Sequence, residues 1–278
     1  MAAGQSAWCR AVPQWQPTIV IRLSIWLHVV VILAGAAWPT AWPWLLMVVL
    51  GNHLFLGLAG MWPRSQFLGA NLFRLPPRSR AEGHVALTFD DGPDPDVTPI
   101  VLDMLDRYAA KASFFCIGQR MAAHPEIVRD IILRGHSVEN HSYRHPSAFA
   151  CLSPSALKHE IEQTRTEIHA LTGTEPMFFR APMGLRSPLL DPVLAQSNLR
   201  YVSWTRRGLD CMSQNPAAVL KRLIRGLSAG DVLLLHDGSC ARTLNGEPIV
   251  VAVLPSLLEH LTQRGLRPVS LPMACTDP

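Results

Sequence analysis

Residues 86–93 read Ala-Leu-Thr-Phe-Asp-Asp-Gly-Pro, and this stretch decides how the rest of the chain is interpreted. An apolar strand runs directly into two carboxylates, and the Gly-Pro pair that follows stops regular structure. Because neighbouring side chains on an extended chain point in opposite directions, Asp90 and Asp91 can hold different roles, one binding a metal and the other taking a proton. Adjacent aspartates in such a turn are also common as solvated turn formers, so the stretch alone leaves both interpretations open.

Short apolar runs alternate with amphipathic stretches beyond residue 84, a pattern typical of repeated strand and helix units around a parallel sheet. The expected strands span residues 85–89, 112–117, 137–139, 177–180, 201–204, 232–235 and 268–271. The expected helices span residues 97–110, 124–134, 154–172, 188–197, 215–228 and 249–264. Polar and titratable residues fall at or just after the strand ends, where an α/β barrel collects its chemistry.

Residues 139–146 read Glu-Asn-His-Ser-Tyr-Arg-His-Pro and place two imidazoles four residues apart. On a helical turn this spacing brings His141 and His145 to one face. Two histidines and one carboxylate make an open metal site that leaves positions for water and substrate. Either histidine alone is more often an ordinary surface or core residue, so the metal site is one of two open interpretations.

Two further strand ends supply a cation and a histidine. Residues 178–184 read Phe-Phe-Arg-Ala-Pro-Met-Gly, and Arg180 is placed to clamp a carboxylate with two hydrogen bonds, although a surface salt bridge is a more common role. Residues 233–238 read Leu-Leu-Leu-His-Asp-Gly, and Asp210 could orient His236 as a general acid. A histidine at a strand end is also common as a capped loop residue.

The N-terminal part contains two apolar stretches, residues 19–38 and 41–62, each close to the ~20 residues that cross a hydrocarbon core. Together they predict a transmembrane hairpin. A single anchor, a re-entrant pair and a cleaved signal peptide ending near residue 36 are the alternatives. Seven of the eight tryptophans lie in this part, mostly near the predicted span ends, as interfacial aromatic belts require: Trp8, Trp15, Trp26, Trp38, Trp42, Trp44 and Trp62.

Polar side chains interrupt both predicted spans. Arg22 and His28 lie in the first span, and Asn52 and His53 lie in the second. Arg22 can extend to the headgroups, whereas His53 needs a partner, a headgroup or water.

Positive charge is concentrated before the first acidic residue, Glu82, and the formal net charge is +4. Apart from Arg22, the arginines of this part lie before the first span or after the second, and none lies in the connecting turn, so the positive-inside tendency predicts a multi-pass inner (cell) membrane protein with a cytoplasmic domain. No basic stripe of the kind that binds nucleic acid follows, and we expect no nucleic-acid partner. The arginines are Arg10, Arg22, Arg64, Arg74, Arg78 and Arg80.

The six cysteines are scattered, without a C-x-x-C pair, which favours free thiols over disulfides or a zinc knot. They are Cys9, Cys116, Cys151, Cys211, Cys240 and Cys275.

In combination, the polar segments resemble the polysaccharide deacetylase family, the family 4 carbohydrate esterases that share the NodB homology domain. The motifs T-F-D-D-G, H-S-x-x-H-P, R-x-P-x-G and L-x-L-H occur in the family's order. The resemblance spans about residues 84–272 and implies an α/β fold, a distorted (β/α)7-type barrel, and the predicted transmembrane hairpin precedes this part and lies outside the resemblance. The expected domains are a membrane anchor at residues 1–63, a basic linker at 64–83, the deacetylase domain at 84–272 and a tail at 273–278.

The same resemblance implies a ligand set and a base. Asp91, His141 and His145 would hold one divalent cation, usually zinc and sometimes cobalt or another ion. Asp90 would be the base that takes a proton from the attacking water, and Arg180 would hold that carboxylate in place.

The resemblance also implies the residues that complete the reaction. His236 would protonate the departing amine, Asp210 would tune that histidine, and the backbone N–H of Met183 would help to stabilise the oxyanion. Met183 itself departs from the family pattern, because an aromatic residue is usual there. Cys211 stands where a tryptophan is common, and Glu139 where a glycine is frequent, so we expect an altered sugar pocket rather than lost chemistry.

The expected reaction is hydrolytic removal of an N-acyl group, with acetyl the expected one, from an amino sugar in a polysaccharide, an oligosaccharide or a lipid-linked glycan. The expected partners are therefore such a glycan and the membrane, and no protein partner can be inferred. One alternative is an O-acetyl ester hydrolase, because an alkoxide leaves more readily than an amide nitrogen. A second is a membrane-tethered glycan-binding protein with an inactive site.

Overall fold

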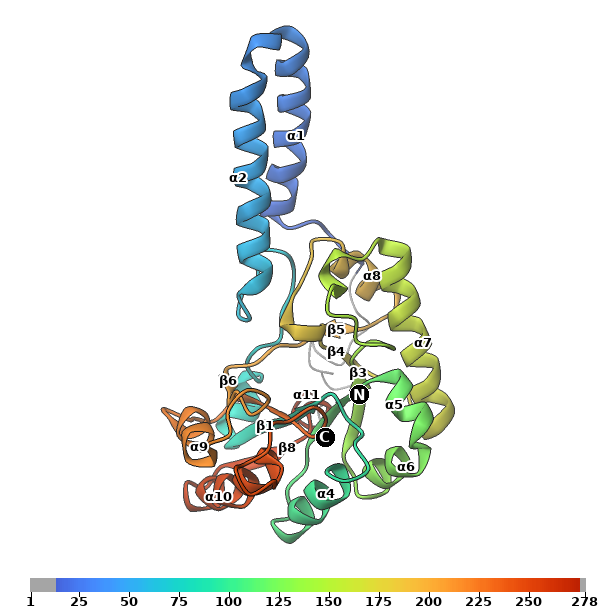
Figure 1. The fold of residues 1–278 in the computed structure, drawn as a ribbon, viewed down its shortest axis with the longest axis vertical. Helices are drawn as coiled ribbons and strands as arrows, with labels where there is room; N and C mark the ends of the chain where they lie inside the picture. The colour runs from blue at the N-terminus through green and yellow to red at the C-terminus, as the bar shows by residue number, and fades with distance from the viewer. Residues whose placement is uncertain (1–13, 276–278) are drawn as a thin grey trace, which may run out of the picture.

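The computed structural model describes residues 14–275, so the expectations for Trp8, Cys9, Arg10 and the end of the tail lie outside the described residues. A helical hairpin stands on an α/β domain in which helices surround a parallel sheet (Figure 1). This arrangement confirms the expected fold class.

The sheet follows the order β5-β4-β3-β2-β1-β7-β6, with β8 paired to β1, and these neighbouring strands are all parallel. Six of the seven residues of β1 are buried, because helices cover one face and the barrel interior the other. The strands are β1 (His84–Asp90), β2 (Ser113–Cys116), β3 (Ser137–Asn140), β4 (Phe178–Phe179), β5 (Arg200–Tyr201), β6 (Arg206–Arg207), β7 (Val232–His236) and β8 (Arg267–Val269).

The surrounding helices agree with the amphipathic stretches to within a few residues. Ser153 caps the start of α7, where its hydroxyl accepts from the N–H of Ala156, and Gly173 ends that helix with a φ of 68°. The helices are α4 (Thr98–Arg107), α6 (Pro125–Leu133), α7 (Pro154–Thr172), α8 (Leu190–Gln196), α9 (Pro216–Ile224) and α10 (Ile249–Gln263).

Short elements differ from the expectations. Strand β6 consists of two arginines and therefore gives no apolar run to recognise. Three short helices were not expected: α3 (Pro77–Ala81) in the basic linker, α5 (Gly118–Ala123) after β2 and α11 (Leu271–Cys275) near the C-terminus. The last expected strand was placed too far along the chain, because β8 ends at Val269 and a helix begins two residues later.

The hairpin consists of α1 (Ile19–Ala37) and α2 (Trp42–Met61), joined by the 3-10 turn η1 (Pro39–Ala41). Both helices are long and apolar enough to cross a membrane, and most of their large apolar side chains are exposed. The polar interruptions meet between them. The Asn52 amide donates to the Ser24 hydroxyl at 2.9 Å, and the His28 and His53 rings lie 5.2 Å apart, so these side chains face each other.

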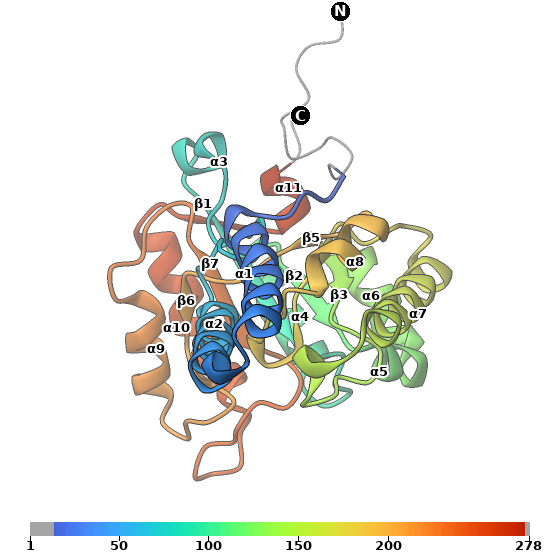
Figure 2. The ribbon, with the colours of Figure 1, turned by 90° about the horizontal axis from the view of Figure 1, so that it is seen from above.

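The segment after α2 packs into the opening of the barrel between β5 and β6. Leu72 forms a bridge to Val202, and Arg74 forms a bridge to Asp231. The expected linker is therefore an ordered part of the domain. Figure 2, seen along the hairpin, places α1 and α2 between α9 on one side and α7 on the other.

The base of the hairpin contacts a loop at the carboxyl ends of the strands. The carbonyl of Gly60, near the end of α2, accepts a hydrogen bond from the N–H of Arg186 at 3.1 Å. The hydroxyl of Ser203 donates to the carbonyl of Pro63. The hairpin is thus attached at the end of the barrel where the strands have their carboxyl ends, rather than at the opposite end.

Candidate active site

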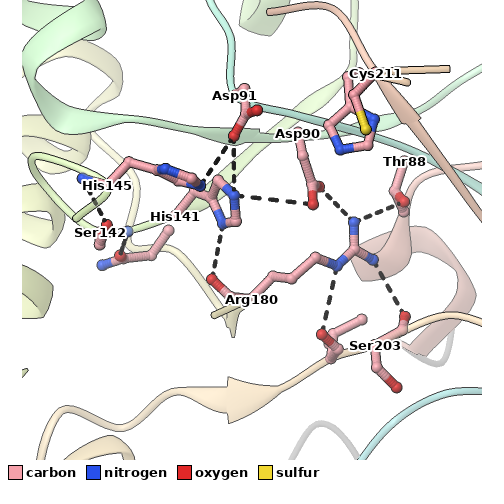
Figure 3. Close-up of polar contacts among 12 residues, drawn as sticks. Thr88, Asp90, Asp91, His141, Ser142, His145, Arg180, Ser203 and Cys211 are labelled. Atoms are coloured by element: carbon pink, nitrogen blue, oxygen red, sulfur yellow. Dashed lines mark hydrogen bonds and ion pairs between the residues drawn. The ribbon is translucent and has the colours of Figure 1, made fainter. Parts of the chain in front are cut away.

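The expected site residues lie at or just beyond the carboxyl ends of neighbouring strands. Asp90 is the last residue of β1, His236 is the last residue of β7, and Asp90 is paired directly with His236 in the sheet. His141 follows β3, and Arg180 follows β4. Figure 3 shows how Asp90, His141 and Arg180 converge, and the sheet topology is the reason, because parallel strands end at one edge.

One ligand atom from each of Asp91, His141 and His145 lies within 4.8 Å of the other two. Oδ1 of Asp91 is 3.3 Å from Nε2 of His141 and 3.2 Å from Nε2 of His145. Metal–ligand distances of ~2.1 Å at tetrahedral angles place two ligands roughly 3.4 Å apart. The three side chains therefore fit a single cation.

The hydrogen bond at the other ring nitrogen of His141 agrees with this fit. Nδ1 lies 2.8 Å from the carbonyl oxygen of Arg180, which can only accept, so Nδ1 carries the proton. Nε2 of the neutral ring then presents its lone pair to the site, the tautomer that a metal ligand needs.

The two histidines do not share a helical turn, so that local expectation was wrong. Residues 141–148 form a loop in which Ser142 and His145 have φ values of 64° and 53°. The hydroxyl of Ser142 accepts from the N–H of His145 at 3.1 Å, and Asn140 Oδ1 accepts from the N–H of Ser142. These bonds bend the chain so that the imidazole centroids lie 4.9 Å apart.

The three side chains shift one another's pKa values in different directions. Burial raises the pKa of Asp91, but the hydrogen bond and charge of His141 and the charge of His145 outweigh it and hold the pKa far below its ordinary value. Burial lowers the pKa of His141, yet the negative charges of Asp90 and Asp91 raise it overall. Burial and the neighbouring His141 lower the pKa of His145.

The buried Arg180 fixes the Asp90 carboxylate. Its Nη1 donates to Asp90 Oδ1 at 2.5 Å and to Thr88 Oγ1 at 2.9 Å. The clamp was expected to be bidentate, but Nε and Nη2 instead donate to the carbonyls of Val202 and Ser203. The guanidinium is therefore tied to β1 and to the chain after β5 at once, which fixes its position.

His236 and Asp210 form the expected pair. Asp210 Oδ1 is 3.0 Å from Nδ1 of His236, and Oδ2 accepts from the backbone N–H of His236 at 2.7 Å. Burial lowers the pKa of His236, but the hydrogen bond and charge of Asp210 outweigh it and raise the pKa to about 9. The imidazolium is therefore the stable form at neutral pH, as a general acid requires.

A cleft of about 500 Å³, within the range of small-ligand sites, opens over the ligand set, Asp90 and His236, whereas Arg180 and Asp210 do not line it. Met183 lies at its rim with 61% of its surface exposed and a φ of 59°, in the turn η3 (Pro182–Gly184). Cys211 also lines the cleft, so two of the three departures from the family pattern are located where a sugar would bind. The cleft also includes Asp90, Asp91, His141, His145, Trp204 and His236.

The third departure has a structural role instead. Glu139 is buried, and its Oε2 accepts from the N–H groups of Met177 and Phe178 at 3.0 and 2.9 Å. It therefore ties β3 to the start of β4 rather than facing the cleft.

Sequence reasoning missed several contributors. Thr88 receives a bond from Arg180 and donates to the carbonyl of Leu233, but an alternating strand residue gives no sign of such a role. Trp204 and Arg207 line the cleft. Their position shortly before Asp210 was the only available signal. Cys116, Cys151, Cys211 and Cys240 form no disulfide within the part of the chain that the structure describes.

The sequence profile of the polysaccharide deacetylase family matches residues 78–202. The chain is similar to a peptidoglycan-N-acetylglucosamine deacetylase of Bacillus cereus, with 32% identity over 189 residues that cover 67% of this chain and 85% of the relative. A chitooligosaccharide deacetylase of Sinorhizobium fredii is 32% identical over 193 residues, which cover 68% and 90% of the two chains. A solved family 4 carbohydrate esterase from Streptomyces lividans, in complex with acetate, matches with a TM-score of 0.60 and 32% identity, over 67% of this chain and 91% of that one.

Proposed function

The chain belongs to the polysaccharide deacetylase family, and we propose that it is a membrane-anchored, metal-dependent hydrolase that removes the N-acetyl group from an amino sugar of a lipid-linked glycan. One observation carries the proposal: the ligand atoms of Asp91, His141 and His145 lie within 4.8 Å of one another, beside a carboxylate held by a buried arginine. The similar proteins described above are deacetylases of N-acetylated glycans, and this similarity supports the proposed reaction class.

A divalent cation fits the three ligands, and zinc is the ion that two imidazoles and a carboxylate favour, with cobalt as a substitute. When bound, it supplies a Lewis acid that polarises the acyl carbonyl.

Asp90 acts as the base. Its Oδ2 lies 3.9 Å from Nε2 of His141, so the carboxylate borders the space that the ligands enclose. Arg180 holds Oδ1, which leaves Oδ2 to accept the proton of the attacking water. Because the guanidinium is anchored to two backbone carbonyls, the carboxylate is aligned before substrate arrives.

His236 protonates the leaving nitrogen. Asp210 occupies Nδ1, so Nε2 is the nitrogen that delivers the proton. The backbone N–H of Met183, in a turn at the cleft rim, is the proposed oxyanion donor. An amide nitrogen leaves poorly, so the acid and the oxyanion donor must already be in place when the tetrahedral species forms.

The hairpin supports a substrate at the membrane surface. We propose that α1 and α2 span the cell membrane and hold the domain at its cytoplasmic side. The reason is that arginines lie near the start of α1 and after the end of α2, whereas the turn between the two helices has none. The contact between Gly60 and Arg186 joins the hairpin to a loop that begins at the Met183 turn. A glycan attached to a lipid would be presented close to this face.

The experiment is a metal analysis joined to an acyl-release assay that quantifies both acetate and new free amine. We expect Asp90→Asn to retain the metal and lose turnover, and His141→Ala to lose both. The exposed residues Asp96 and His159 provide matched controls, because Asp96→Asn and His159→Ala make the same chemical changes away from the cleft. Full activity in His141→Ala would contradict the proposed metal site.

The same assay separates the alternatives. Acetate released without a new amine would identify an O-acetyl ester hydrolase. Glycan binding by a purified protein that holds no metal and releases no acetate would identify a binding protein.

A further inference from the structure

Arg207 places a cation at the wall of the active-site cleft, and no carboxylate of residues 14–275 forms an ion pair with it. It ends β6 and is half-buried, and it lines the cleft together with Asp90 and His236. Its nearest polar contact is Sγ of Cys211 at 3.9 Å, a weak acceptor, and its guanidinium carbon lies 5.5 Å from the centroid of the Trp204 ring. Its Nε is buried and has no hydrogen-bond partner among residues 14–275.

The other arginines of this region are occupied. Arg144 pairs with Glu160 at 2.7 Å, and Arg180 pairs with Asp90. Arg120 donates to the carbonyl of Asp91 and to Ser239. Even the adjacent Arg206, on the same short strand, pairs with Asp231 at 3.1 Å.

Burying a cation partly costs free energy unless an anion pairs with it. Within the described part of the chain, Arg207 has no such anion. We infer that Arg207 binds an anionic group of the substrate, namely the phosphate that joins the acylated sugar to its lipid. This inference rests on the proposed function, because it specifies the substrate of the same site.

The position of Arg207 favours a phosphate over other anions. Thr205, two residues before it, accepts a hydrogen bond from Nη2 of Arg64 at 2.8 Å through its backbone carbonyl. Arg64 lies three residues beyond the end of α2, so the segment that carries Arg207 is hydrogen-bonded to the base of the hairpin, while Arg207 itself lines the cleft with the reacting groups. In a lipid-linked sugar the phosphate joins the lipid to the sugar. With the lipid at the hairpin and the sugar in the cleft, the phosphate would lie near Arg207.

The neighbouring side chains suit this role. The guanidinium lies over the Trp204 ring, which limits the orientations it can take. Cys211 is small and a weak hydrogen-bond acceptor, so it leaves the donors of Arg207 available to a planar, bidentate contact with phosphate oxygens.

The test compares two N-acetylated substrates in the full-length, metal-loaded protein: a neutral chitooligosaccharide and an N-acetylglucosamine phosphodiester of a short isoprenoid alcohol. We expect Arg207→Gln to lower the ratio of kcat/KM for the phosphodiester to kcat/KM for the neutral sugar by about 10- to 100-fold, mainly through KM. Arg207→Lys should restore part of the ratio. Arg129→Gln, a matched change at an exposed arginine of α6, should leave the ratio unchanged.

An unchanged ratio of the two kcat/KM values would overturn the inference, whether both values fall equally or neither falls. A substrate that carries a carboxylate in place of the phosphate, if its turnover depended on Arg207 more strongly than turnover of the phosphodiester does, would overturn the assignment of the anion as phosphate. Calorimetric binding of a short isoprenyl phosphate tests the site without turnover. Weaker binding of the isoprenyl phosphate by Arg207→Gln than by wild type supports the inference, and equal binding overturns it. If neither substrate is hydrolysed, that failure refutes only the proposed reaction, and the binding result still decides the inference.

Discussion

Substituting Asp210 by Asn tests how the structure sets the acid of the reaction. Asp210 contacts His236 twice, at Nδ1 and at the backbone N–H, and the change removes its charge while keeping its shape. The pKa of His236, about 9 in the intact protein, should fall toward its ordinary value of 6.5, because only the negative charges of Asp90 and Asp91 then oppose the effect of burial.

The magnitude follows from the two titration curves. With a pKa of about 9, roughly 90% of His236 is protonated at pH 8, whereas with a pKa of 6.5 the fraction is roughly 3%. Turnover of Asp210→Asn should therefore be about 30-fold lower than wild type at pH 8 and nearly equal at pH 6. A bound cation lowers the pKa of His236 in both proteins, so the separation between the two profiles remains.

The assay is kcat/KM for acetyl release from pH 5.5 to 9.5, with metal content and thermal unfolding measured for both proteins. The alkaline limb should shift to lower pH in Asp210→Asn. A uniform loss across the pH range would refute the reasoning, because it would mean that Asp210 only orients the imidazole.

Three further changes test other parts of the molecule. Arg180→Met should destabilise the protein by about 3–5 kcal/mol and abolish turnover, because it leaves the Asp90 carboxylate buried and unpaired; a thermal unfolding temperature equal to that of wild type would contradict this. Burial and Lys111 lower the pKa of His136 to about 4, so the folded state needs its neutral form, and the free energy of unfolding should fall by about 2–3 kcal/mol as the pH drops from 6.5 toward 4. His136→Phe should remove that pH dependence, and unfolding curves at pH 7 and 4.5 would reveal it. A C-terminal reporter that is active only in the cytoplasm should be active when fused to this chain, and activity of a periplasm-specific reporter would reverse the proposed orientation.

The main strands and helices were predictable because their signals are local. An apolar run that ends in a polar pair identifies β1 and β7, and the cap at Ser153 with Gly173 bounds α7. Strand β6 was not predictable, because its two residues are both polar and adopt strand structure only by pairing with β7.

The candidate site was predictable as a set of residue types but not as a geometry. The motifs identified Asp91, His141 and His145, yet the loop that joins the two histidines was expected to be helical. Nothing near Arg180 in the sequence indicates that three of its contacts would go to Thr88, Val202 and Ser203.

Sequence alone determined the alternation of strands and helices, the apolar hairpin and the chemical types at the strand ends, because each depends on neighbours within a few positions. Only the tertiary structure decided which charged side chains have a partner of opposite charge. Arg144, Arg180 and Arg206 find carboxylates, the first 16 and the second 90 positions away, while Arg207 finds none among the described residues. Charge pairing depends on distances in space, and those exist only once the sheet has brought distant strand ends together.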